Sequence, residues 1–380
     1  HINPETAAPA AFMLTTISEI KVIDDYTFQF ITKEPCSSLL YNLTHEDMGI
    51  LNEKAVTEAG ADYANHPIGT GPYKFVSWKK NQEIRLVRND EYFKEPAKVA
   101  NLVIRIIPEG ATMMAELQTG GVDVALNVGS QFVPMFQPGT GIKLEQFNTF
   151  TIKYLSFDHR VAPFNDVRVR QAINYATNKE AIVKVAYSNA AEPLSGPLPK
   201  NINGFNENLV PYEYNVAKAK ELLAAAGYAG EKILLVTTPD YPAMYNATLV
   251  VHAQLVAAGI NAEVEQYDFA TFMEHRANPD KFSLYITSNS YNILPVTLSV
   301  LNPGWAGLDA AEVPAGIAAI KAAATAADAA AEWQALEEFL YDYGAASVLG
   351  HYSDVSATAA GVEGFNYFNF PIYWNVKVPG

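Results

Sequence analysis

The chain is almost free of cysteine and has far fewer basic than acidic residues. Cys36 is the only cysteine among 380 residues, which excludes an internal disulfide framework and a metal site built from several cysteines. Lysine and arginine total 26 against 41 aspartates and glutamates, giving a formal net charge of −15. Nucleic-acid-binding proteins place basic patches against the phosphate backbone. The charge balance therefore argues against a nucleic-acid partner and suits a protein that stays off anionic membrane surfaces.

Long apolar runs and the common catalytic motifs are missing as well. No uninterrupted apolar stretch reaches the ~18 residues needed to cross a bilayer. The sequence does not start with basic and then apolar residues, so we expect any signal peptide to be removed or absent. The P-loop, GxSxG and HExxH patterns do not occur. No pair of carboxylates is singled out for acid–base chemistry, so we expect no enzyme, no metal site and no cofactor.

The composition is that of a globular α/β protein with more than one domain. Hydrophobic residues make up 49% and charged residues 18% of the chain, which allows a sizeable core. At roughly 100–200 residues per domain, the length fits two or three domains. Residues 233–238 and 260–267 have strand patterns on either side of a helical pattern over residues 243–258. Such a βαβ unit pairs its two strands in parallel.

A run of strand, turn and helix signals lies between His66 and Asp123. Gly69 and Gly71 flank a threonine before Pro72, so the chain turns tightly and no helix begins there. This placement of proline also excludes a dinucleotide-binding loop. The segment reads HPIGTGPYKFVSW, then EIRLVRNDEYF, LVIRIIPE, ATMMAELQ and TGGVDVAL.

These motifs, in this order, resemble the extracytoplasmic solute-binding proteins of family 5, the peptide/nickel class of ABC importer subunits. Gly121 stands where that family usually has glutamate. Residues 162–182 (APFNDVRVRQAINYATNKEAI) and 215–227 (NVAKAKELLAAAG) match further family motifs. They predict a helix capped by Asp166 and a helix that ends at Gly227. The matching positions in the first stretch are Pro67, residues 69–73, Trp78, Arg88, Asn89, Tyr92, Phe93, Leu117, Gln118 and residues 120–123.

The resemblance implies a two-lobed α/β fold of the periplasmic-binding-protein type (type II, the large cluster with an extra subdomain), with mixed parallel sheets and flanking helices. In that family a long segment precedes the hairpin that we expect around Asp24 and Asp25. We therefore expect the chain to be a fragment that lacks its amino-terminal part. The expected domains are residues 1–65 as the remainder of the small subdomain of lobe 1, residues 66–152 with 348–380 as lobe 1, and residues 153–347 as lobe 2.

The resemblance also indicates where a ligand would bind. In the peptide-binding branch, a loop after a lobe-2 strand carries an aspartate that pairs with the peptide ammonium, and the backbone before it takes the peptide as an added strand. Aligned on Pro295, that loop is residues 287–295 here, with Ser288 at the family's tryptophan and Tyr291 at its aspartate. The arginine that receives the carboxylate in dipeptide binders is missing near Tyr245. The residues expected to contact ligand are Ser288, Asn289, Ser290, Tyr291, Asn292, Trp305, Asn127, Asn148 and Tyr245.

Because both charged anchors are absent, the sequence leaves two kinds of ligand open. The first is an oligopeptide held mainly by its backbone, and the alternative is an oligosaccharide or another polar, uncharged solute. Either would be closed between two lobes and delivered to the transmembrane subunits of an ABC permease. An enzyme or a peptide chaperone on the same scaffold is the alternative from another class. We expect a monomer outside the cytoplasm, in the periplasm or as a cell-surface lipoprotein.

Overall fold

The protein divides into two compact units, residues 1–48 with 148–353 and residues 49–147 with 354–380. The division crosses two long strands, β7 (Lys143–Phe157) and β12 (Ala346–Thr358). The predicted lobe boundaries and the small subdomain over residues 1–65 stay a prediction. The computed structural model describes residues 11–36, 39–136, 139, 141–194, 196–202, 204–278, 284–290, 308–323, 325–368 and 370–379.

The largest sheet among the described residues has seven strands. Its order is β10–β9–β11–β7–β12–β6, and β8 pairs with β12 beside this path. β9 is parallel to both β10 and β11, whereas β7 runs antiparallel to β11. The predicted βαβ unit is confirmed, because helix α7 connects β9 to β10. The bounds are β6 (Val124–Ala125), β8 (Ala191–Glu192), β9 (Ile233–Thr237), β10 (Ala262–Gln266), β11 (Leu284–Ser290) and α7 (Pro242–Ala257).

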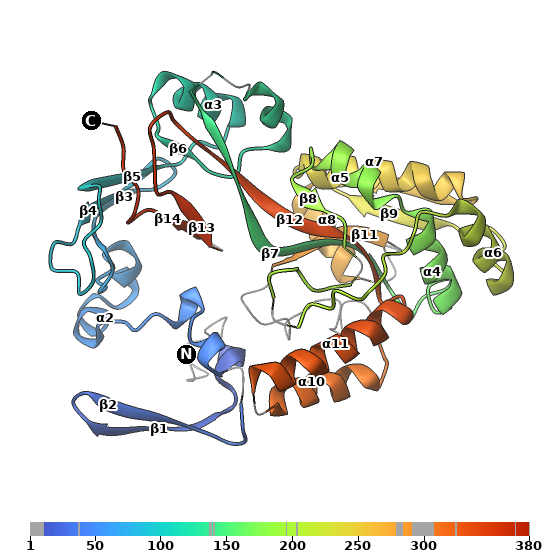
Figure 1. The fold of residues 1–380 in the computed structure, drawn as a ribbon, viewed down its shortest axis with the longest axis horizontal. Helices are drawn as coiled ribbons and strands as arrows, with labels where there is room; N and C mark the ends of the chain where they lie inside the picture. Colours follow the sequence, from blue (N-terminus) through green and yellow to red (C-terminus); the bar gives the residue numbers. More distant parts are fainter. Residues whose placement is uncertain are drawn as a thin grey trace. The chain divides into compact units, whose positions relative to one another are not determined.

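Helices pack on both faces of this sheet within the first unit (Figure 1). Successive side chains of β7 point to opposite faces. Leu155 and Phe157 join a core with α4 to α7, while Ile152 and Tyr154 pack with α10 and α11. Phe272 of α8 forms a smaller cluster with residues of β9 and β11. The helices are α4 (Val167–Ala176), α5 (Lys179–Ala186), α6 (Val216–Ala226), α8 (Phe269–Ala277), α10 (Glu312–Ala322) and α11 (Ala326–Asp342).

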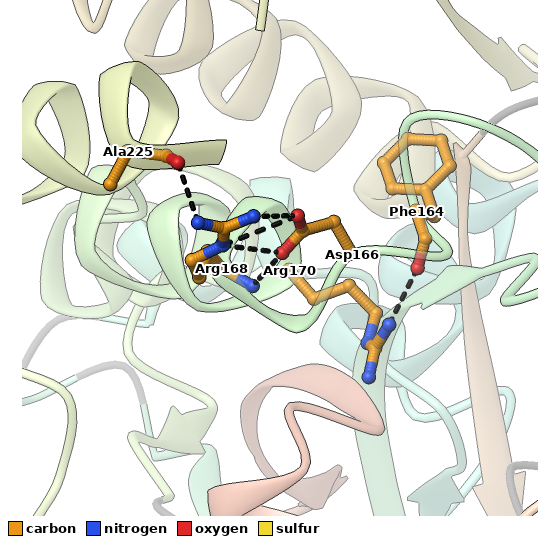
Figure 2. Close-up of polar contacts among 5 residues, drawn as sticks. All are labelled: Phe164, Asp166, Arg168, Arg170 and Ala225. Atoms are coloured by element: carbon orange, nitrogen blue, oxygen red, sulfur yellow. Dashed lines mark hydrogen bonds and ion pairs between the residues drawn. The ribbon is translucent and has the colours of Figure 1, made fainter. Parts of the chain in front are cut away.

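The RVRQAI motif begins α4, and its first arginine serves the helix start (Figure 2). Asp166 Oδ1 accepts a hydrogen bond from the Arg168 amide at 2.8 Å, so the predicted cap is confirmed. The Arg168 guanidinium pairs with the same carboxylate and donates to the Ala225 carbonyl near the end of α6. One acidic cap therefore also ties two neighbouring helices together.

Arg170, the second arginine of the motif, is buried and bound by backbone carbonyls. It donates to Phe164 at 2.6 Å, Tyr343 at 2.8 Å and Gly344 at 3.2 Å, and its guanidinium lies 4.6 Å from the centroid of the Tyr343 ring. Figure 2 shows the contact with Phe164. Burial lowers the pKa of Arg170 from its usual value. Arg170 thus binds α4 to the turn after α11.

The second unit is built around the antiparallel sheet of β3 (Tyr73–Lys79), β4 (Glu83–Arg88) and β5 (Asn101–Arg105). Asn89 follows β4, and its Nδ2 donates to the Gly71 carbonyl at 3.0 Å. Its backbone N–H donates to the Pro72 carbonyl at 2.9 Å. The GTGPY and RN motifs therefore hold one turn. The remaining elements are α2 (Glu53–Ala59), α3 (Gly110–Thr119), β13 (Asn366–Phe368) and β14 (Phe370–Ile372).

The predicted hairpin near residues 24–25 is confirmed as β1 (Ile17–Asp24) and β2 (Thr27–Thr32). Its apolar side chains face solvent on the described structure, with Tyr26 97% and Val22 74% exposed. Among the described residues, no helix combines the length and the apolar character that crossing a membrane requires. Short helical segments complete the chain at α1 (Leu39–Asn42) and at the 3-10 turns Ala11–Leu14, Glu46–Met48, Gly60–Asn65 and Ser130–Met135.

Candidate ligand-binding site

Strand β11 extends beyond β9, the strand that pairs with it on one side. It pairs with β7 over all of its length, from Leu284 opposite Phe157 to Ser290 opposite Thr151. Its pairing with β9 covers only Leu284 and Tyr285. Over residues 286–290, no described strand occupies the backbone edge on the β9 side. Such an edge can accept an extended peptide as an added strand.

On one face of the sheet, the buried apolar side chains end at the same place. Residues directly opposite each other in an antiparallel pair project from the same face. Ile286 and Leu155 form a buried pair. The next pair on that face is Ser288, which is exposed, with Lys153, which is partly exposed. The apolar core therefore ends between these two pairs, and polar side chains continue the face.

The segments that follow β9 lie at the same end of the sheet as the carboxyl end of β11, because β9 and β11 are parallel. Asp240 Oδ2 accepts a hydrogen bond from the Phe269 amide at 2.8 Å, which fixes the loop after β9 to the start of α8. The rings of Tyr241 and Phe269 contact each other at 5.1 Å and stay exposed. Open α/β sheets hold their ligands outside the carboxyl ends of such strands.

Three of the predicted ligand residues lie together on this strand. The sequence pattern places residues 287–295 in a loop, whereas the structure continues β11 through Ser288, Asn289 and Ser290. The loop prediction is wrong for these residues because pairing with β7 extends the strand. Their contact with a ligand stays a prediction. Tyr291, Asn292 and Trp305 lie outside the described residues.

The structure places the other predicted residues on three different elements. Asn148 is exposed on β7, and its Oδ1 accepts from Ser353 Oγ at 3.1 Å. Tyr245 is half-buried in the first turn of α7, close in sequence to the end of β9. Asn127 belongs to the second unit, where it is exposed with a left-handed φ of 52°. Their roles at a ligand site also stay predictions.

Lys153 is a residue of this region that the sequence analysis missed. Its Nζ lies 4.8 Å from the centroid of the Tyr352 ring, and burial lowers its pKa to about 8. Among the described residues it has no hydrogen bond and no ion pair. The signal in the sequence is one lysine within the otherwise apolar strand IKYLSF.

Three other strongly shifted groups of the first unit, His159, Glu337 and Lys179, are held by the backbone. His159 bonds the Ala345 carbonyl at 2.9 Å, and burial with the nearby Arg170 lowers its pKa to about 4. Glu337 accepts from two amides, and burial raises its pKa to about 7. Lys179 donates to a carbonyl, and burial lowers its pKa to about 8. Among the described residues, no three His, Cys, Asp or Glu side chains gather as a metal site.

The motifs, the fold and this strand edge agree with a comparison against known families. Residues 1–309 match the family described as bacterial extracellular solute-binding proteins, family 5 Middle. The chain belongs to this family. The resemblance predicted from the sequence motifs is thereby confirmed, and the family is one of receptors that bind solutes.

Two curated relatives and one solved structure show how far the similarity extends. The glutathione-binding protein GsiB of Pectobacterium atrosepticum is 30% identical over 268 residues, covering 70% of this chain and 52% of the relative. The dipeptide-binding protein of Escherichia coli is 30% identical over 268 residues, covering 68% of this chain and 50% of the relative. This family member therefore spans about half the length of both relatives.

The solved structure is the ABC transporter-associated periplasmic binding protein DppA from Helicobacter pylori in complex with peptide STSA. It superimposes with a TM-score of 0.80 at 24% sequence identity, covering 97% of this chain and 75% of that chain. At this identity the likeness shows the fold alone. The predicted two-lobed fold of periplasmic binding proteins is confirmed.

Proposed function

We propose that this family member is the solute receptor of an ABC importer and that it binds an oligopeptide. The observation that carries the proposal is the open edge of β11 over residues 286–290. The relatives named for glutathione and dipeptide binding support a peptide ligand. The bound peptide is handed to the transmembrane subunits of the permease. The family description supports a place outside the cytoplasm. Within that, we propose the periplasm or the cell surface through a lipid anchor.

The open edge explains how a peptide binds without the two charged anchors of the dipeptide binders. An added strand forms hydrogen bonds with the backbone N–H and C=O groups of β11, and every peptide offers these groups whatever its side chains. Peptide side chains project alternately from the two faces of the strand that is added. The exposed rings of Tyr241 and Phe269 provide apolar surface at the same edge of the sheet.

A receptor without catalytic activity accounts best for the polar groups of the first unit. Catalysis by acid and base groups needs titratable side chains that converge on a substrate with shifted pKa values. The shifted groups His159, Lys179 and Glu337 are each engaged with a backbone partner instead. Their shifts follow from burial in the fold.

Hydrogen exchange of the purified protein, together with native mass spectrometry, tests the proposal. We expect co-purified masses that fit amino-acid residues, or retention of members of a random tripeptide library added to the protein. Bound peptide should slow amide exchange over residues 286–290 and leave α4 (Val167–Ala176) unchanged as an internal control. Masses spaced by a sugar unit, no retained peptide, or unchanged exchange over residues 286–290 would each contradict the proposal.

A further inference from the structure

Lys153 combines burial with the lack, among the described residues, of any hydrogen-bond or ion-pair partner for its ammonium group. The side chain leaves β7 on the face that carries Leu155 and Phe157, where the neighbouring positions are core. An ammonium group in such surroundings is normally paired with a carboxylate or hydrogen-bonded to carbonyls. Lys153 has neither among the described residues, and it still keeps part of its surface exposed. The residue is therefore largely enclosed by the protein but not closed off from solvent.

The surroundings of Lys153 supply a second donor that also lacks an acceptor. The Tyr352 ring lies under Nζ at 4.8 Å, and the same ring contacts that of Tyr187 edge-on at 6.2 Å. Tyr187 is only 2% exposed, and its hydroxyl has no hydrogen-bond partner among the described residues. Two donors thus gather around one tyrosine ring without an oxygen to receive them.

An acidic group on β8 and a basic group on β12 are each engaged with another partner. Glu192 on β8 pairs with Lys200 at 2.6 Å. His351 on β12 bonds the Thr149 carbonyl at 2.6 Å. Burial is the whole cause of the lowered pKa of Lys153, with no charged neighbour contributing. The described part of the protein therefore leaves this ammonium for a charge from outside.

We propose that Lys153 binds a carboxylate of the ligand, so that this receptor selects peptides that carry a negative charge at this position. The inference rests on the proposed peptide function and names the class of ligand. Ser288, directly opposite Lys153, lies on the β11 segment with the open edge. A peptide along that edge is separated from β7 by β11, so its anionic group has to extend over Ser288 to reach the lysine. The carboxylate is either the carboxyl terminus of the peptide or an acidic side chain.

A random tripeptide library, prepared as free acids and as carboxy-terminal amides, separates these cases. The retained peptides are identified by mass spectrometry for the wild-type protein and for Lys153→Met. We expect the wild type to retain free acids about tenfold or more above amides, the effect of one hydrogen bond to a charged group. The methionine variant should lose that preference. Retention of only those amides that contain aspartate or glutamate would assign the carboxylate to a side chain.

Two further variants and two further measurements test whether the preference depends on Lys153. Lys153→Arg keeps the charge and should restore part of the preference, whereas Lys143→Met, at an exposed lysine on the same strand, should leave it unchanged. Melting curves establish that each variant is folded. Binding at pH 8 to 9 should take up protons in the wild type, because a bound carboxylate raises the pKa of the lysine. Calorimetry in buffers of different ionisation enthalpy measures this uptake, and Lys153→Met should abolish it.

The outcomes separate this inference from the function on which it rests. If the wild type retains no peptide of either kind, the peptide function fails and the inference falls with it. If peptides bind but Lys153→Met changes neither the preference for free acids nor the preference for amides that contain aspartate or glutamate, the peptide function stands and the role of Lys153 is wrong. A preference that persists in the variant would likewise overturn it.

Discussion

Two lysines of the first unit have similarly lowered pKa values but differ in exposure and in hydrogen bonding. Burial lowers the pKa of both Lys153 and Lys179 to about 8. Each Nζ lies near a tyrosine ring, Tyr352 at 4.8 Å and Tyr212 at 6.0 Å. Lys179 is fully buried and donates to the Leu194 carbonyl at 3.0 Å, whereas Lys153 is partly exposed and has no acceptor among the described residues. With similar desolvation, Lys179 is therefore a structural group and Lys153 a candidate binding group.

The surroundings of Lys179 show what a fully engaged polar region looks like. Glu337 of α11 accepts from the amides of Leu198 and Asn206, so one carboxylate fixes both ends of the loop after β8. A side chain added at Gly196 would collide with that carboxylate. Nothing in the sequence distinguishes these polar groups from those near Lys153. The two sets of polar groups differ in their backbone partners, because Lys179 and Glu337 form hydrogen bonds with backbone atoms and Lys153 forms none among the described residues.

The largest expected effect is at Arg170, a buried cation that donates to three backbone carbonyls. Arg170→Met leaves the carbonyls of Phe164, Tyr343 and Gly344 without their donor in a buried site. We expect a loss of about 3 to 5 kcal/mol in the free energy of unfolding, measured by urea denaturation. Arg168→Met is the matched control, because its ion pair with Asp166 is exposed, and it should cost about 1 kcal/mol or less. Equal losses in both variants would contradict this assignment.

A smaller effect concerns the pH dependence that Glu337 imposes. Burial raises its pKa in the folded protein to about 7, above the usual value of 4.5, so the folded state holds its proton more tightly than the unfolded state. Stability should therefore fall by about 3 kcal/mol as pH rises from about 4.5 through 7, and stay level above about pH 8. Unfolding free energies between pH 5 and 8 measure the slope. Glu337→Gln, which cannot titrate, should remove this part of it, and an unchanged slope in the variant would refute the attribution.

The smallest expected effect sharpens the comparison of the two lysines directly. Lys179→Met and Lys153→Met both remove a desolvated charge, but only the first also removes a hydrogen bond to a carbonyl. We expect Lys179→Met to be the less stable variant by about 1 to 2 kcal/mol, with no loss of stability in Lys153→Met. Thermal and urea unfolding in the absence of peptide measure the difference. A loss of stability in Lys153→Met of the same size would show that Lys153 belongs to the fold.

The sequence predicted the local features of the fold well. The hairpin around residues 24–25, the cap at Asp166, the helix end at Gly227 and the parallel pair of β9 and β10 all follow from short patterns, and all are confirmed. Such features depend on neighbours within a few residues. A single capping side chain or a glycine with positive φ is enough to define them.

The candidate site was less accessible to sequence reasoning because its properties come from distant contacts. Residues 288–290 have the polarity of a loop, and only pairing with β7 makes them a strand. Lys153 looks like a surface lysine until Tyr352 of β12 is placed beneath it. The two arginines of RVRQAI look equivalent, yet one is exposed and the other buried among carbonyls from the turn after α11.

The carbonyl partners of Arg170 also set an order of events when the chain is made. The Gly344 carbonyl lies 174 residues after the arginine that it binds. At a synthesis rate of ~5–20 residues per second, α4 waits on the order of 10 to 30 seconds for that acceptor. During that interval its guanidinium has only the Phe164 carbonyl and water as partners, so the contacts of α4 cannot be completed until the turn after α11 has emerged. The turn after α11, in the last third of the chain, thus has to be made before Arg170 in the middle third can complete its hydrogen bonds.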